Sequence, residues 1–291
     1  MMGPLGSIAR YDYRQFVLDE LVAAKAGRTV SVCLPARDER STIGPIVDQV
    51  HGHPLVDEVL VVDDHSTDGT AEAAAGAGAR VVRASEVLVS HGDGPGKGQA
   101  LWKATAEATG DLIAFLDADV RDFSSRFVVG LLGPLLLDER LAFVKAFYER
   151  PGDGHPRGGG RVTELVARPI LHLLFPHLAE VVQPLAGEFA APRAVLEQLP
   201  FVEGYGVDIG LLIDAAARFG VDRLAQVDLG VRVHRNRPLT DLGPMATVVL
   251  MTALRRAGID QVPDHVLLDQ PDVHAVPVTY AERPPLATLS R

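Results

Sequence analysis

Residues 112–120, LIAFLDADV, are the stretch that decides the fold of this chain. Five apolar residues in a row predict a strand covered on both faces, as the centre strands of parallel sheets are. The strand ends in two carboxylates, Asp117 and Asp119, separated by one residue. Ligands of open α/β sheets bind at the carboxyl ends of the strands, where carboxylate oxygens suit Mg²⁺ or Mn²⁺ carrying phosphate oxygens. Asp-x-Asp alone is common, so its position after a buried strand is what predicts a site.

Strands and helices alternate through the residues before this stretch. Apolar or β-branched runs predict three strands, and the spacing of apolar residues predicts four helices, of which the second has Ser41 as its expected N-cap. The strands are expected at residues 29–34, 57–62 and 80–83, and the helices at residues 11–26, 41–50, 70–75 and 99–108. This alternation is typical of parallel βαβ units. The fold class is therefore α/β, with a Rossmann-like, mostly parallel central sheet flanked by helices.

The second half of the chain is less regular, but it shows no clean linker. Strands are expected at residues 141–148, 186–190 and 224–233, and helices at residues 162–175, 209–219 and 245–256. We therefore predict one domain over residues 8–259. Its nucleotide-binding half is residues 8–120 and its second half residues 121–259. A proline-rich tail, residues 260–291, is expected on the surface or against a partner chain.

Composition excludes some classes of partner. The net charge is -10, which argues against nucleic acid, because the phosphate backbone needs a basic surface. No apolar run approaches the roughly 20 residues of a membrane span, so no membrane partner is expected. The single cysteine, Cys33, fits a reducing cytoplasm, which is the expected location.

Polar clusters follow four of the predicted strands. The clusters are Pro35 to Glu39, Asp63-Asp64, Asp117 to Asp119, and His234-Arg235-Asn236. A parallel sheet puts these ends on one side, where their polar groups can converge on a ligand. Any one cluster could instead be a solvated turn, since Asp, Asn and Ser are common turn residues. All four together favour a site.

Several further groups have both a functional and a structural interpretation. The loop 92–98, GDGPGKG, fails as a P-loop but could present N–H groups and Lys97 to an anion, or simply expose a lysine. His234 could bind a metal or lie in the core. Arg161 and Thr163, at a helix start, could bind an anion or only cap the helix. Asp208 and Glu188 could be carboxylates of the site, or they could only stabilise the helix start or turn in which they lie.

A set of motifs in fixed order gives the chain a family resemblance. The motifs are LPARDE, VVDDHSTDGT, GPGKGQALW, FLDADV, GGGRVTELVARPIL, QPLAGE, GYGVDIGLLID and VRVHRNRPL. Together, over about residues 11–259, they resemble the glucosyl-3-phosphoglycerate synthases, which are retaining glycosyltransferases of the GT-A fold. The resemblance implies transfer of glucose from UDP-glucose to the 2-hydroxyl of 3-phosphoglycerate, a divalent cofactor (Mg²⁺ or Mn²⁺) and a homodimer.

The resemblance also implies the residues of the site. Metal binding falls to Asp119 and His234. The acceptor-binding residues are Gly160, Arg161, Thr163 and Asn236. The donor-binding residues are Pro35, Ala36, Arg37, Glu39, Asp64, Ser66, Lys97, Asp117, Ala118, Leu185 and Arg232. Asp208, Glu188 and Lys97 are the catalytic candidates. Asp208 departs from relatives that have Glu there, which shortens a side chain expected near the sugar.

Other functions stay open from the sequence. A sugar nucleotidyltransferase would need a G-x-G-x-R loop after the first strand, and LPARDER is not one. Another GT-A transferase is an alternative, either a mannosyl-3-phosphoglycerate synthase or an enzyme acting on lipid phosphates, which would want membrane-facing helices. A non-catalytic nucleotide-sugar-binding protein is a third, although it has no need of an anion site at Arg161.

Overall fold

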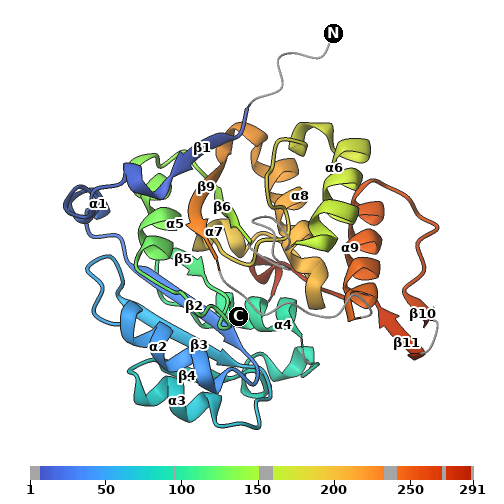
Figure 1. Cartoon of the computed structure of the whole chain (residues 1–291), viewed down its shortest axis with the longest axis horizontal. Helices are drawn as coiled ribbons and strands as arrows, with labels where there is room; N and C mark the ends of the chain where they lie inside the picture. The colour runs from blue at the N-terminus through green and yellow to red at the C-terminus, as the bar shows by residue number, and fades with distance from the viewer. Residues whose placement is uncertain (1–6, 95, 151–159, 233–240, 271–272, 290–291) are drawn as a thin grey trace.

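The computed structural model describes residues 7–94, 96–150, 160–232, 241–270 and 273–289. At its centre is an eight-stranded sheet in the order β1-β9-β6-β7-β5-β2-β3-β4 (Figure 1). The strands are β1 (Ala9–Asp12), β2 (Val30–Ala36), β3 (Glu58–Asp63), β4 (Arg80–Arg83), β5 (Leu112–Phe115), β6 (Phe143–Glu149), β7 (Phe189–Pro192) and β9 (Leu224–Val231). All run parallel except β7, which pairs antiparallel with both β5 and β6. The predicted mostly parallel sheet is confirmed.

Helices cover both faces of this sheet, which produces three layers (Figure 1). One face carries α1 (Leu18–Lys25), α2 (Arg40–Val50), α3 (Thr70–Gly76) and α5 (Arg126–Leu137); the other carries α4 (Lys97–Glu107), α6 (Arg168–Leu174), the short α7 (Arg193–Leu196), α8 (Val207–Phe219) and α9 (Leu242–Arg256). Strand β2 shows why helices are needed on both faces of the sheet. Its residues Val32 and Leu34 pack into one apolar cluster, and Cys33 between them packs into the other. A strand that is apolar on both faces must be covered on both.

Two predictions about the first sheet face are wrong. The expected helix at residues 11–26 is the strand β1, a 3₁₀ turn and only then α1. Pairing of β1 with β9, which makes β1 the edge strand of the sheet, outweighs local helix propensity there, a common outcome of tertiary context. The helix α5 was missed, because its sequence, RFVVGLLGPLLL, is apolar nearly all round and contains Pro134, so it lacks an amphipathic period.

The start of α2 also differs from the prediction. Ser41 is not the N-cap, because the helix begins at Arg40 after Glu39. The Arg40 N–H donates instead to Asp68 Oδ2 at 3.1 Å, and Asp68 Oδ1 accepts from the Thr70 N–H at 3.0 Å. Asp68 therefore caps two helix starts, which explains its place in the turn.

The expected strand at 186–190 is found a little later as β7, and the expected helix at 162–175 is a π-helical turn (Thr163–Ala167) that continues into α6. The last residues form the antiparallel hairpin of β10 (His265–Gln270) and β11 (Val273–Thr279). Next, β12 (Glu282–Arg283) pairs with β8 (Phe201–Val202). Within the described ranges, no helix has the length and apolar character needed to cross a bilayer.

Candidate active site

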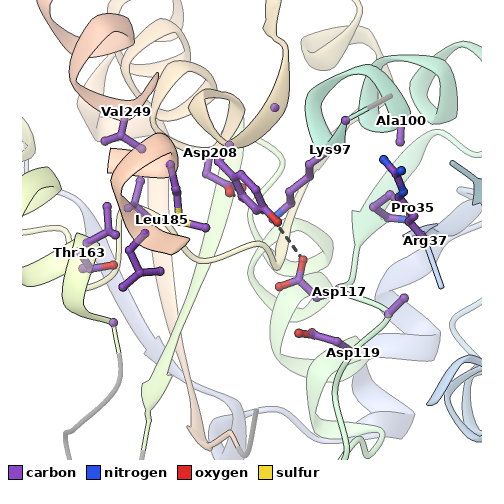
Figure 2. A pocket seen from close by; sticks show the side chains of 18 of the residues that line it. Pro35, Arg37, Lys97, Ala100, Asp117, Asp119, Thr163, Leu185, Asp208 and Val249 are labelled. Carbon is purple, nitrogen blue, oxygen red and sulfur yellow. Dashed lines mark hydrogen bonds and ion pairs between the residues drawn. The ribbon is translucent and has the colours of Figure 1, made fainter. Parts of the chain in front are cut away.

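A cavity of about 450 Å³ opens at the carboxyl ends of β2, β3, β5 and β9. Figure 2 shows Pro35 and Arg37 on one side of it, Asp117 and Asp119 below, Lys97 and Asp208 reaching in beside them, and Thr163 on the far side. The predicted site residues that line it are Pro35, Ala36, Arg37, Glu39, Asp64, Lys97, Asp117, Ala118, Asp119, Gly160, Arg161, Thr163, Leu185, Asp208 and Arg232. Polar groups at four strand ends thus converge, as parallel topology requires.

Four predicted residues are not among the described residues that line the cavity. His234 and Asn236 lie outside the described residues. Ser66 faces a smaller depression beside β4, where its hydroxyl accepts a hydrogen bond from the Asp38 N–H at 3.0 Å. Glu188 is fully buried, so it can influence the cavity only through the side chains that cover it.

Lys97 is the cation at the centre of the cavity. Its Nζ lies 3.2 Å from Asp117 Oδ1 and 3.1 Å from Asp208 Oδ2 (Figure 2). Burial opposes the ammonium charge, but these two carboxylates outweigh it and raise the pKa of Lys97. Lys97 therefore stays charged across the physiological range.

Asp208 is held from below as well. Lys145 Nζ, on β6, donates to the Asp208 carbonyl oxygen at 3.3 Å, and burial lowers the pKa of Lys145 to about 8. Asp208 Oδ1 is buried and has no hydrogen-bond partner among the described residues. An unsatisfied buried acceptor is costly, and Asp208 is also one of the residues that line the cavity.

The loop that leads into Lys97 is fastened to the end of β3. The Gly96 N–H donates to Asp64 Oδ2 at 2.9 Å, while His65 Nδ1 and Nε2 lie 3.0 Å from Asp64 Oδ1 and 3.2 Å from Asp93 Oδ2. The two carboxylates raise the pKa of His65 through these hydrogen bonds, because only the imidazolium donates from both nitrogens. His65 thus connects the glycine loop to a residue that lines the cavity.

Helix α4, which begins at Lys97, lies directly against β8. A Cβ placed on Gly98 would meet the Val202 carbonyl oxygen at 1.8 Å. Only glycine permits this close approach of two backbones, so Gly98 sets the position from which Lys97 reaches the cavity.

Arg232, at the end of β9, joins both aspartates of the central stretch. Its Nη2 lies 3.1 Å from Asp117 Oδ2 and 2.7 Å from Asp119 Oδ1, and its Nε lies 3.2 Å from Glu188 Oε1. Burial opposes the charge of Asp117, but Lys97 and Arg232 lower its pKa well below the ordinary value. Burial raises the pKa of Glu188, which also accepts from the Tyr148 hydroxyl at 2.6 Å.

The donor set at the end of β5 fits a hard cation. Asp119 carries its carboxylate into the cavity with 41% of the side chain exposed, and Mg²⁺ and Mn²⁺ favour such oxygen ligands. Among the described residues, no group of three or more His, Cys, Asp or Glu side chains could hold a metal. The second predicted ligand, His234, lies outside those residues.

A guanidinium and a helix start lie at the far side of the cavity. Gly160, with φ 79°, precedes Arg161 and Thr163, which line the cavity at the start of the helical segment. The Gly160 carbonyl oxygen accepts from the Glu164 N–H at 3.0 Å, which closes the first turn around Thr163. A guanidinium and a helix start suit a phosphate or carboxylate.

Sequence reasoning missed several residues of the cavity wall. Arg150 and Tyr205 add polar groups, and Leu242, Met245 and Val249 of α9 form an apolar side. The spacing of the last three, at i, i+3 and i+7, is the pattern of one helix face and could have identified them. No local pattern identifies Arg150, since it reaches the site from the end of β6.

Comparison with known proteins agrees with this geometry. Residues 31–170 match the model of the family described as glycosyl transferase family 2. A glucosyl-3-phosphoglycerate synthase from Mycolicibacterium paratuberculosis is 47% identical over 290 residues, which cover 93% of this chain and 87% of the relative.

Solved structures match the whole architecture. The crystal structure of glucosyl-3-phosphoglycerate synthase from Mycobacterium tuberculosis in complex with Mn²⁺, UDP-glucose and phosphoglyceric acid superposes with a TM-score of 0.88. It is 46% identical and covers 98% of this chain and 99% of that one. Another structure of the Mycobacterium tuberculosis synthase contains Mg²⁺ and UDP, with a TM-score of 0.88, 46% identity, and coverage of 96% of this chain and 98% of that one. The expected GT-A fold is confirmed, and the chain belongs to the glucosyl-3-phosphoglycerate synthase family.

Proposed function

We propose that this protein transfers glucose from UDP-glucose to the 2-hydroxyl of 3-phosphoglycerate and so produces glucosyl-3-phosphoglycerate. The observation that carries the proposal is that one cavity holds two sets of groups. Carboxylates and Lys97 lie at the strand ends, and Arg161 with Thr163 lies across from them. Such a cavity suits a nucleotide sugar and a small anion together. The relatives named above carry out this reaction by name, and one of them is described with both substrates and Mn²⁺.

The donor is expected to lie along the strand ends. Pro35, Arg37 and Glu39 follow β2 on the side of the cavity where the uridine would bind, and Asp117 and Ala118 follow β5. Leu185 and Arg232 would complete the sugar and diphosphate positions. These placements follow the general rule that nucleotides bind at the carboxyl ends of parallel strands.

The cofactor of this reaction is Mg²⁺ or Mn²⁺, which Asp119 and His234 would hold. When bound, the cation supplies positive charge to the departing diphosphate. The side chains of Lys97 and Arg232 would also supply positive charge to the departing diphosphate. Lys97 has three N–H donors, and two of them face Asp117 and Asp208, so one is left for a diphosphate oxygen.

Retention of configuration requires a nucleophile on the protein or attack from the face of the leaving group. Glu188 is fully buried beneath Arg232, so it is poorly placed to attack the sugar. We therefore favour attack by the acceptor hydroxyl on the face that the diphosphate leaves, with a diphosphate oxygen taking the hydroxyl proton. Asp208 would orient the glucose, since it lines the cavity and pairs with Lys97.

The acceptor would bind at Gly160, Arg161 and Thr163, with Asn236 from beyond β9. A phosphate ester with a carboxylate carries several charged oxygens, and charge-assisted hydrogen bonds to a guanidinium are among the strongest that proteins make. This end of the cavity is therefore the part that distinguishes 3-phosphoglycerate from uncharged acceptors.

We also propose a homodimer in the cytoplasm. Leu165 and Leu173, eight residues apart on the π-helical turn and α6, are 72% and 76% exposed, and exposed apolar side chains on one helical face favour a protein contact. A reducing compartment is consistent with Cys33, which is a free thiol buried in the core. Light scattering of the wild type and of Leu173→Lys would test the dimer.

A donor and acceptor panel tests the function. UDP-glucose, GDP-glucose and GDP-mannose are each combined with 3-phosphoglycerate or glycerate, with and without EDTA, and nucleotide release is measured. We expect release only with UDP-glucose, 3-phosphoglycerate and free metal. Preference for GDP-mannose would support the mannosyl alternative, and donor binding without release would support the non-catalytic one.

A further inference from the structure

The segment formed by residues 280–289 returns to the body of the protein next to the loop that carries Lys97. Strand β12 pairs with β8, the Glu203 N–H donates to the Ala281 carbonyl oxygen at 2.8 Å, and the Ala287 N–H donates to the Glu197 carbonyl oxygen at 2.8 Å. The indole N–H of the buried Trp102, on α4, donates to the Pro284 carbonyl oxygen at 2.8 Å. Residues 280–289, part of the tail expected on the surface or against a partner chain, therefore form part of the packing around α4.

Arg283 is the residue of this segment that faces the glycine loop. Its Nε donates to Gln99 Oε1 and its Nη1 to the His91 carbonyl oxygen, while Nη2 lies 2.8 Å from Glu203 Oε1. The guanidinium also lies 5.9 Å from the centre of the Trp102 ring. Three acceptors from three segments thus meet one side chain, which is only 17% exposed.

These contacts fix the start of the glycine loop that leads into Lys97. The fully buried Gln99 donates through Nε2 to the Gly92 carbonyl oxygen at 3.1 Å. Gly92 has φ 91°, and a Cβ there would lie 3.5 Å from Arg283 Nη2. Arg283 and Gln99 therefore hold residues 91 and 92 at the start of the loop. Gln99 also belongs to the first turn of α4, two residues after Lys97.

The end of the loop, next to Lys97, packs against β8, the strand with which β12 pairs. Val202 of β8 pairs with Glu282, and its carbonyl oxygen is the atom that Gly98 approaches so closely. Glu203, the ion-pair partner of Arg283, lies near the loop as well, since a Cβ on Gly94 would be 4.0 Å from Glu203 Oε2. Both ends of the loop thus rest on groups that Arg283 joins.

We propose that Arg283 is a positioning residue for the binding and activation of the donor, because it holds residues 91, 92 and 99 in the arrangement from which Lys97 meets Asp117 and Asp208. It does not line the described cavity, so it acts through Lys97 and not on the substrate. A planar guanidinium with five N–H groups can satisfy all three acceptors at once. Without it, Glu203 beside the loop would lose its described counter-ion.

The simplest competing explanation is that Arg283 only fastens the C-terminal segment. Arg255 provides the matched control, because it fastens other C-terminal residues, at positions 262, 264 and 280. It donates to Asp264 Oδ1 at 2.6 Å and to the Val262 carbonyl oxygen at 2.7 Å, and it lies 4.3 Å from the Tyr280 ring centre. None of these contacts involves residues 91–99.

The test compares Arg283→Ala with Arg255→Ala by hydrogen–deuterium exchange and by kinetics. For Arg283→Ala we expect exchange of residues 91–99 to accelerate at least tenfold. The donor kcat/KM should fall at least tenfold, while the KM for 3-phosphoglycerate stays within twofold of wild type. Arg255→Ala should leave all three quantities unchanged. If Arg283→Ala cannot be purified, Arg283→Lys replaces it, because one ammonium cannot reach all three acceptors.

Two outcomes would overturn the proposal. The first is that the Arg283 variant shows the same hydrogen exchange of the loop and the same donor kcat/KM as Arg255→Ala. The second is that the variant impairs the kinetics toward 3-phosphoglycerate as much as the kinetics toward the donor. The kinetic part depends on the proposed function, whereas the exchange part does not. Wild-type protein without turnover on this substrate pair would count against the function alone, and exchange would still decide the role of Arg283.

Discussion

Replacement of Lys97 by methionine removes a positive charge that joins Asp117 to Asp208. Methionine keeps most of the side-chain volume, so the change isolates the charge and its hydrogen bonds. The two carboxylates are mostly buried, with 21% of Asp117 and 5% of Asp208 side-chain area exposed. They would face each other with Arg232 still paired to Asp117.

The magnitude follows from these two contacts. A hydrogen bond to a charged group contributes about 1.5–3 kcal/mol, so losing two could lower the free energy of unfolding by about 3–6 kcal/mol. Protonation of one carboxylate offsets part of this loss, which leads us to expect about 3 kcal/mol. Loss of a preorganised charge that faces developing negative charge lowers kcat by about 10²–10³. The KM for 3-phosphoglycerate should change little.

The acid side of the stability curve supplies a second measurement. Lys97 helps to lower the pKa of Asp117. A carboxyl group with a lowered pKa stabilises the fold above its unfolded pKa, and this contribution is lost as the pH falls through the folded pKa. In Lys97→Met the folded pKa of Asp117 rises, so acid unfolding should begin at a higher pH.

Kinetics and thermal unfolding from pH 3 to pH 8 would follow both effects. Lys25→Met is the control, because Lys25 also pairs with an aspartate, Asp57, at 2.6 Å but does not line the cavity. Wild-type kcat in Lys97→Met, or an acid limb that does not move, would refute the role given to Lys97.

Three further predictions concern the loop, the helix start and the acceptor end. Asp64 and Asp93 raise the pKa of His65, so the contacts of His65 with both carboxylates are present below that pKa and are lost as the pH rises through it. The KM for UDP-glucose of the wild type should therefore rise over that pH range. A His65→Gln variant with the same pH profile would exclude this cause. Gly98→Ala should destabilise the protein by about 3 kcal/mol or more, because of the 1.8 Å approach to Val202, whereas Gly76→Ala, with no atom within 4 Å, should stabilise it by about 0.5–1 kcal/mol in denaturant unfolding. Arg161→Ala should raise the KM for 3-phosphoglycerate about tenfold to 100-fold and leave UDP-glucose binding unchanged in calorimetry, and weakened donor binding would show that the acceptor site is placed wrongly.

The first half of the fold could be predicted because its signals are local. Residues 112–116 are apolar without interruption, β2 and β3 are similarly apolar, and short connections leave parallel pairing as the natural topology. The rule that strand ends share one side then brings Asp64 and Asp117 together without knowledge of any contact.

What could not be predicted depends on contacts between distant residues. Strand β1 exists because β9 accepts it as an edge, and β12 because it pairs with β8. Glu188 is suggestive as a carboxylate in a turn, yet Tyr148 and Arg232 bury it. Ser66 lies in a promising motif, but the turn directs its hydroxyl to Asp38. No periodicity or spacing encodes such contacts.

The most direct test of the proposed reaction is the structure of its product. Purified protein would be incubated with Mg²⁺, 3-phosphoglycerate and UDP-glucose labelled with ¹³C at the anomeric carbon, and the product examined by NMR. We expect an α-anomeric glucose whose labelled carbon shows a three-bond coupling, across the glycosidic oxygen, to the proton on C2 of 3-phosphoglycerate. A β-anomer would contradict the same-face mechanism, and free glucose or unreacted donor would contradict the transfer itself.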